Sequence, residues 1–128
     1  MGVILSTSAR NDVCNVVADQ LDAGSSNGRL KLYDVNFSTL MAQFEFGDPA
    51  FTSAVDGTTS ANTVASTSVV ANGTIGRFLF DTSDGTTILS GTVSASSGGD
   101  INLTEVSVII GDILTFNYLT MTMPTGSY

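Results

Sequence analysis

Apolar and polar residues alternate most regularly between Thr74 and Val93, in the stretch TIGRFLFDTSDGTTILSGTV. Phe78 and Phe80 stand two positions apart among mostly polar neighbours, which is the pattern of a strand with one buried face. The Ser-Asp-Gly sequence at 83–85 predicts a tight turn, because glycine tolerates a positive φ and aspartate can hydrogen-bond its own backbone. Residues 87–93 then return as the partner strand. We therefore expect a β-hairpin at the centre of the chain.

The pattern changes to a helical period between Ser6 and Ala23. On a helical wheel one arc is apolar and the opposite face is polar. The apolar arc holds Ala9, Val13, Val16, Val17 and Leu21 with Cys14 at its edge, and the polar face holds Asn11, Asp12, Asn15, Asp19 and Asp22. Two interpretations stay open: the helix covers the core of a β-rich body, or it docks on a partner. Arg10 falls inside the apolar arc, where it can extend to solvent or meet a partner's carboxylate.

Shorter alternating or apolar runs predict the other strands. We expect strands at 29–34, 39–46, around 62–66, 101–103, 106–110 and 113–123, with 51–55 as a short strand or a loop. In 39–46 the pattern places Leu40, Ala42, Phe44 and Phe46 on the inner face and Met41, Gln43 and Glu45 on the outer face. The aromatic residues Tyr33, Phe37, Phe44, Phe46, Phe51, Phe78, Phe80, Phe116 and Tyr118 are expected mostly in the core.

Seven or eight short strands separated by Gly or Asp are typical of an antiparallel β-sandwich or jelly roll. We therefore predict a mainly β single domain over residues 1–128, with one N-terminal amphipathic α-helix. Residues 1–24 form the arm and helix, 29–123 the β-sandwich body, and 124–128 a surface tail. The length suits one domain with one core.

The charge distribution excludes several classes of partner. The net charge is −8, and only 12% of the residues are charged, while Ser and Thr make up about a quarter of the chain. Residues 1–31 are neutral, and after them nine carboxylates face a single cation, Arg77. Such an acidic chain repels phosphate backbones and anionic lipids. We therefore expect no nucleic-acid partner and no membrane partner. The single cysteine permits no internal disulfide and fits a reducing cytoplasm.

Candidate nucleophiles and bases are scarce. No histidine occurs in the chain, which removes Ser–His and Cys–His pairs and histidine metal ligands. Cys14 lies on the predicted helix with no neighbouring base, so we interpret it as a small apolar residue. No tryptophan is present, which weakens a carbohydrate-binding interpretation.

Acidic residues offer only weak sites. A glycosidase needs two facing carboxyl groups, and the nearest pairs in sequence, Asp81 with Asp84 and Asp100 with Glu105, include aspartates that turns favour anyway. Residues 81–85 carry oxygens that suit Ca²⁺ but lack the spaced acidic series of a dedicated loop. We therefore expect no enzyme, no cofactor and no metal site.

The order of segments resembles a group of small Ser/Thr/Gly-rich structural proteins in the virions of tailed bacteriophages. The segments that carry the resemblance are LKLYD at 30–34, LMAQFEFGDPAF at 40–51, ANGTIGRFLFDTSDGTTILSGTV at 71–93, GGDINL at 98–103 and GDILTFNYLTMTMP at 111–124. These are strand-and-turn patterns that cover nearly the whole chain. Members of the group include head decoration proteins.

The resemblance implies a protein made in the bacterial cytoplasm that binds the outer surface of the assembled head, contacts the major capsid protein and stabilises the shell. A homo-oligomer, with a trimer as the first guess, is expected because exposed β-edges pair readily. From the charge distribution we expect docking through Arg10, Val13, Val17, Leu21, Arg29 and Lys31. The alternatives are a tail or neck component of the virion, or a small host-attachment or glycan-binding β-sandwich.

Overall fold

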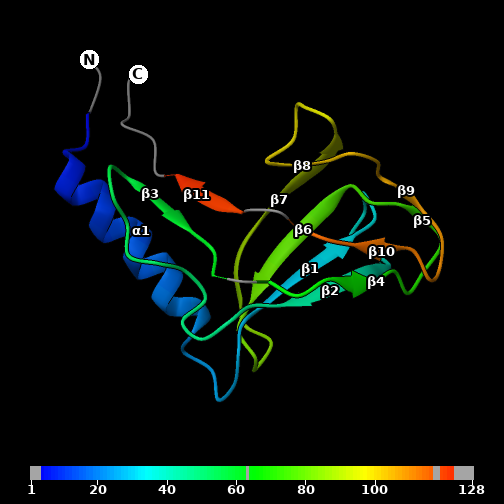
Figure 1. The fold of residues 1–128 in the computed structure, drawn as a ribbon, viewed down its shortest axis with the longest axis horizontal. Coiled ribbons are helices and arrows are strands. Elements are labelled where there is room, and N and C mark those ends of the chain that lie inside the picture. Colours follow the sequence, from blue (N-terminus) through cyan, green and yellow to red (C-terminus); the bar gives the residue numbers. More distant parts are fainter. Residues whose placement is uncertain (1–3, 63, 117–118, 123–128) are drawn as a thin grey trace.

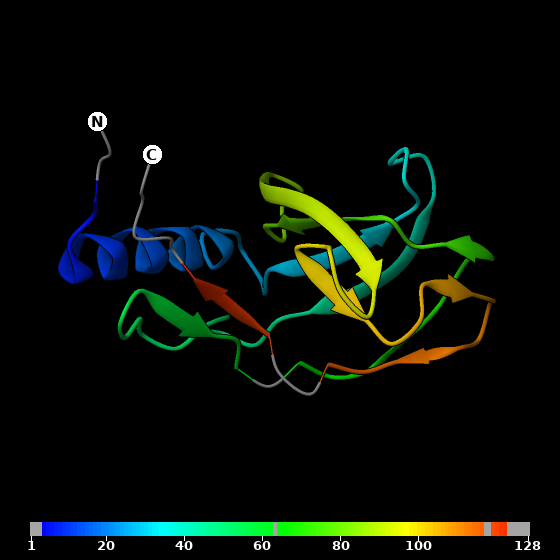
Figure 2. The same cartoon turned by 90° about the horizontal axis from the view of Figure 1, so that it is seen from above.

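The protein is mainly β with one helix. The computed structural model describes residues 4–62, 64–116 and 119–122 (Figure 1). In chain order the elements are α1 (Thr7–Leu21), β1 (Arg29–Tyr33), β2 (Leu40–Glu45), β3 (Thr58–Ser60), β4 (Thr67–Ser68), β5 (Gly73–Thr74), β6 (Arg77–Asp81), β7 (Thr87–Ala95), β8 (Ile101–Leu103), β9 (Ser107–Val108), β10 (Ile113–Leu114) and β11 (Thr120–Thr122). Both views place α1 at one end of the long axis and β4, β5, β9 and β10 at the other (Figures 1 and 2).

A five-stranded sheet with the order β2-β1-β6-β7-β8 forms the centre of the protein. The predicted hairpin is confirmed as the antiparallel pair β6–β7. Leu30 of β1 pairs with Phe44 of β2 on one side and with Phe80 of β6 on the other. All three side chains are buried, as alternation predicts, and together they build the inner face of the sheet.

The last pair of this sheet corrects the prediction of a wholly antiparallel fold, because β8 runs parallel to β7. Parallel neighbours usually need a crossover of a dozen residues, whereas residues 96–100 make this return alone. The Asp100 carboxylate accepts hydrogen bonds from the Thr92 N–H and hydroxyl, at 3.0 and 3.2 Å, and the Ser96 N–H donates to the Leu103 carbonyl at 2.7 Å. These bonds hold the short return in place.

The other six strands form three two-stranded ladders that belong to one long ribbon. Thr58 pairs with Thr122 in β3–β11, Thr67 with Leu114 in β4–β10, and Thr74 with Ser107 in β5–β9. In each pair of the first ladder the two residue numbers add up to 180, and in each pair of the other two ladders they add up to 181. The pairing register therefore shifts by only one residue between the first ladder and the other two. We call the described residues of segments 58–75 and 106–122 the ribbon.

The ribbon continues the curvature of the sheet beyond β2. The Val70 N–H donates to the Met41 carbonyl at 2.8 Å, which links the first ribbon segment to the free side of β2. The structure corrects the prediction that Met41 lies on the outer face, because its side chain is only 1% exposed. The register between β1 and β2 skips Met41, so this bulged residue turns its side chain inward.

Two further strand predictions are wrong. The described residues between 61 and 66 form no strand beyond a single bridge at Ala61, and the pairing lies on either side of them, in β3 and β4. The expected strand at 113–123 is divided into β10 and β11. The predicted position of Tyr118, the surface tail 124–128 and the first three residues lie outside the described part of the chain.

One core joins the sheet, the ribbon and the helix. The ring of Phe46 packs edge-on against that of Phe80, with 5.3 Å between the ring centres, and its centre lies 5.5 Å from that of Phe51. The ring centres of Phe44 in the sheet and Phe116 in the ribbon are 4.7 Å apart. Phe37 does not belong to this core: it is 40% exposed in the β1–β2 turn, with a φ of 56°.

The helix is confirmed, but it packs through a different face from the predicted one. The side chain of Ser6 caps its N-terminus by accepting from the Ala9 N–H at 3.1 Å. The buried residues of α1 are Cys14, Ala18 and Leu21, whereas Val13 and Val16 of the apolar arc are 40% and 59% exposed.

Polar side chains explain why the helix packs through a face other than the predicted one. Asn11 accepts from the Gly57 N–H at 2.7 Å, Asn15 from the Ala54 N–H at 2.9 Å, and Asp22 from the Ala50 N–H at 3.1 Å. These three residues of the predicted solvent face therefore satisfy backbone donors of the loop 50–57. The helix does cover the β-body, by a mixed polar and apolar contact.

Candidate docking surface

Three of the four basic residues in the chain gather on the outer face of the five-stranded sheet. Arg29 and Lys31 alternate with buried leucines along β1, so they lie opposite the core. Arg77 lies on the same face of β6, because its cross-strand partner is Tyr33, two residues after Lys31. Basic side chains are thus concentrated on this outer face, where they lie beside the carboxylates of Glu45 and Asp81.

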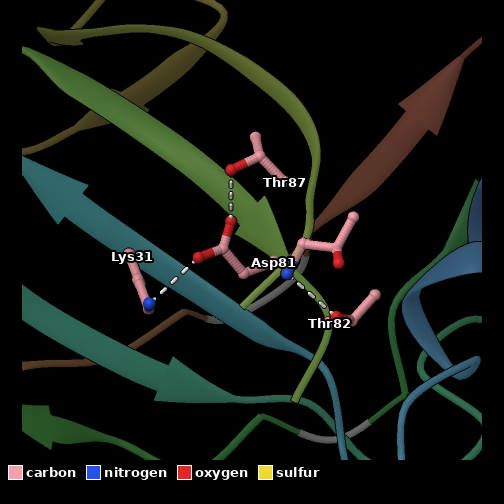
Figure 3. A network of polar contacts seen from close by, with 5 residues as sticks. Lys31, Asp81, Thr82 and Thr87 are labelled. Carbon is pink, nitrogen blue, oxygen red and sulfur yellow. Dashed lines mark hydrogen bonds and ion pairs between the residues drawn. The ribbon is translucent and has the colours of Figure 1, made fainter. Parts of the chain in front are cut away.

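A buried ion pair lies in the middle of this face (Figure 3). Lys31 Nζ is 2.9 Å from Asp81 Oδ2, and the hydroxyl of Thr87 donates to Asp81 Oδ1 at 3.0 Å. The side chain of Asp81 is 5% exposed and that of Lys31 20% exposed. The Asp81 carboxylate thus finds its partners within the sheet, and the Lys31 side chain is only partly exposed to solvent.

Arg77 is held at the end of the face nearest the β1–β2 turn. Its guanidinium carbon lies 5.7 Å from the centre of the Phe37 ring, and its Nε–H donates to the Val35 carbonyl at 3.4 Å. Tyr33, the cross-strand partner of Arg77, contacts the same ring in a tilted arrangement, with 5.7 Å between the centres of the Tyr33 and Phe37 rings. An arginine beside two aromatic rings offers a partner both charge and apolar area.

The turn beside Arg77 carries a carboxylate with an altered pKa. The hydroxyl and N–H of Ser38 donate to the Asp34 carboxylate at 2.6 and 2.8 Å, and the Thr39 N–H at 3.3 Å. These hydrogen bonds hold the pKa of Asp34 below its ordinary value, the Ser38 hydroxyl contributing most. Asp34 therefore keeps its negative charge at the edge of the basic face.

Arg29 completes the basic group at the opposite end of β1. It pairs across the strands with Glu45 of β2 and with Asp81 of β6. Its Nε is buried and lacks a hydrogen-bond partner among the described residues. Any contact that a partner makes with Arg29 must therefore use the terminal guanidinium nitrogens and not the buried Nε.

The structure separates the six residues predicted to dock. Arg29 and Lys31 belong to the basic face, whereas Arg10, Val13, Val17 and Leu21 belong to the helix at the end of the molecule. Leu21 is fully buried in the protein's own core and is not presented to a partner. Arg10 donates to the Asp56 carbonyl and to the Thr7 hydroxyl, both at 3.2 Å. On the helix, Val13 is the predicted docking residue with the clearest exposure.

Sequence reasoning missed Arg77 as a member of this surface. Its outward position was readable from the alternation with Phe78 and Phe80, but its proximity to Lys31 depends on the pairing of β1 with β6. These strands are more than forty residues apart in the chain, so no local pattern reveals their contact.

The groups considered for chemistry are engaged in structural contacts. The thiol of Cys14 is buried and donates to the Gly57 carbonyl at 3.1 Å. Asp84 accepts from the Ser25 hydroxyl, and Asp100 holds the return before β8. Within residues 4–62, 64–116 and 119–122, no three His, Cys, Asp or Glu side chains are grouped as metal ligands would be. Over the same residues, no helix has the length and apolar character needed to cross a bilayer.

We compared the chain with protein-family models, with curated proteins and with solved structures, and none of the three comparisons gave a match.

Proposed function

We propose that this protein is a non-enzymatic structural component of a tailed-phage virion, and that it decorates the outer surface of the head by binding the major capsid protein. The resemblance of its strand-and-turn segments to virion proteins supports this proposal. The observation that carries the docking mode is the basic face formed by Arg29, Lys31 and Arg77 on an acidic chain. Such a face fits an acidic area of a partner, where opposite potentials guide association and fix orientation.

Many symmetric copies make a weak individual contact effective. A module that binds only the assembled shell stabilises it by mass action, and repeated contacts on one particle add avidity. A polar surface with few charges suits close packing of neighbouring copies. We propose a trimer as the oligomer on the capsid.

We also propose that the sheet and the ribbon are the two layers of a β-sandwich or jelly roll. The contact between Phe44 and Phe116 and the single core support this finer assignment.

Counting bound copies tests the function directly. The purified protein is mixed with mature capsids that lack it, the capsids are pelleted, and the bound protein is quantified. We expect saturation at a copy number that matches the capsomer lattice, together with a higher temperature of capsid rupture. Saturation at one or a few rings of copies would instead support the tail or neck alternative, and no binding would contradict both.

Charge-neutral variants test the docking face. We expect the double variant Arg29→Gln/Arg77→Gln to weaken capsid binding about tenfold or more, which is roughly 1.4 kcal/mol. Arg10→Gln removes the same kind of charge from the helix end and is the matched control, with an expected change below about twofold. If Arg10→Gln and Val13→Asp abolish binding while the double variant binds fully, the helix and not the sheet is the docking surface.

A further inference from the structure

The two free edges of the curled sheet face one another across a groove. One edge is β8, which has a neighbour only on the β7 side. The other edge is the ribbon segment that contains β10 and β11, whose described pairing is only with β4 and β3. Unpaired edge strands present backbone donors and acceptors in a row, and they readily accept another strand.

Cavities mark the space between these edges. Three neighbouring cavities of about 430, 400 and 400 Å³ lie along it. The first shares Leu103 and Phe116 with the second, and Ile101 and Leu119 with the third, so the three form one continuous groove. These four shared residues place apolar side chains on both edges of the groove, among polar lining residues such as Asn102, Thr104 and Thr115.

The charges along the groove are of one sign. Asp100, Glu105 and Asp112 line it, and none of the described lining residues is Lys or Arg. The carboxylate of Asp112 accepts from the Ile109 N–H at 3.0 Å, and Asp100 is bound to Thr92, so both stay in place. An acidic segment is therefore repelled from the groove, whereas an uncharged apolar strand meets no such cost.

The chain carries an uncharged apolar segment outside its own sheet. Ile4 and Leu5 precede the helix cap, are 75% and 37% exposed, and form none of the hydrogen bonds made within the described chain. No charged side chain occurs before Arg10. Both views place this segment at the end of α1 that lies far from β8 (Figures 1 and 2).

We propose that the N-terminal segment around Ile4 and Leu5 of a second copy of this chain adds as a strand in the groove between β8 and the ribbon. Strand addition supplies backbone partners to the open edges and places alternate side chains on the apolar lining. Each copy donates one arm and accepts another, so a closed pair or ring satisfies every groove. This self-association is independent of capsid binding.

Sedimentation velocity of the full-length protein over a range of concentrations tests this proposal. We expect concentration-dependent oligomers, and at least about a tenfold weaker association for Ile4→Asp, because an acidic residue in the arm meets the acidic groove. Val16→Asp is the matched control: Val16 is 59% exposed on the helix, and its substitution should change association less than about twofold. A protein that stays monomeric, or oligomers that Ile4→Asp leaves unchanged, would overturn the proposal.

A cross-link locates the contact. In a Cys14→Ala background, Ile4→Cys combined with Thr104→Cys should form disulfide-linked oligomers on oxidation, because Thr104 lines the groove. Val16→Cys combined with Thr104→Cys should not form them. A synthetic peptide with the sequence of residues 1–6 should compete with the cross-link. If the control pair cross-links as well as the Ile4 pair, the arm is not the occupant. Melting curves of each variant, followed by circular dichroism, confirm that it is folded.

Discussion

The five-stranded sheet and the ribbon are both β-structure, but they are held together in different ways. In β1 and β6, inward and outward residues alternate over five positions, and β2 alternates from Ala42 to Glu45 after the bulge at Met41. Each strand of the sheet's interior has a neighbour on both sides. The ribbon has ladders of two or three residues separated by irregular segments. The difference follows from side chains, because large apolar residues give the sheet one defined register while Ser, Thr and Ala give the ribbon little preference.

Like the ribbon, the helix is attached to the rest of the protein by short, separate contacts. Besides the buried Cys14, Ala18 and Leu21, the helix is attached to loop 50–57 by separate hydrogen bonds from Asn11, Asn15 and Asp22. We therefore expect the sheet to contribute most of the stability, and the ribbon and helix to depend on it. Three sets of substitutions test this arrangement.

Phe44→Ala should have the largest effect, because Phe44 is 2% exposed and joins the sheet to the ribbon through Phe116. We expect it to lower the free energy of unfolding by about 3–5 kcal/mol. Phe116→Ala, from the partly buried ribbon side of the same contact, should cost only about 1–2 kcal/mol. Urea unfolding followed by circular dichroism measures both values. Equal losses would show that the sheet and the ribbon contribute alike to this contact.

Alternation made the sheet predictable. The inward positions of Leu30, Leu32, Phe78 and Phe80 follow from their spacing alone, and so does the β6–β7 hairpin. The prediction failed at Met41, where a bulge reverses one side chain, and at β8, whose parallel direction depends on bonds between residues 92, 96, 100 and 103. Such features arise from pairing between strands and leave little trace in a local pattern.

The helix face could not be predicted from hydrophobicity. Val13 and Val16 are as apolar as Leu21, yet they are largely exposed, because the unpaired N–H groups of the loop select Asn11 and Asn15 instead. Only part of the basic face was predicted. Arg29 and Lys31 were chosen from the charge distribution along the sequence, whereas Arg77 lies beside them only because β1 pairs with β6.

The Lys31–Asp81 pair tests the outer face of the sheet and should give the second-largest effect. Lys31→Met leaves the Asp81 carboxylate, 5% exposed, with Thr87 as its one remaining side-chain partner, so we expect a loss of about 3 kcal/mol. Asp81→Asn keeps the size and the acceptor for Thr87, and it leaves Lys31 with a partial path to water. Its expected cost is therefore about 1 kcal/mol.

Thermal and urea unfolding of the two variants provides the measurement, and the double variant Lys31→Met/Asp81→Asn closes the cycle. A double variant less destabilised than Lys31→Met would confirm that the cost arises from an unpaired buried carboxylate. Equal and additive losses for the two single variants would show that the pair contributes through packing instead.

Asp22→Asn should give the smallest change, and its sign is opposite. Burial raises the pKa of Asp22, and the nearby carboxylates of Asp48 and Asp19 add to the shift, although the Ala50 N–H opposes it. The folded protein therefore holds this proton more tightly than the unfolded chain, so ionisation of Asp22 reduces stability as the pH rises through the interval between the two pKa values. The position at the C-terminus of α1 is also unfavourable for a negative charge.

The asparagine keeps the oxygen that accepts from Ala50 and removes the charge. We expect Asp22→Asn to raise the free energy of unfolding at pH 7 by about 0.3–1 kcal/mol. The gain should disappear well below pH 3.8, the ordinary pKa of the group, where Asp22 itself is protonated. Asp12→Asn, which neutralises an exposed aspartate earlier in the same helix, is the matched control and should give no such gain. Urea unfolding at both pH values compares the variants, and a loss at pH 7 would mean that the helix needs the charged form of Asp22 to hold loop 50–57.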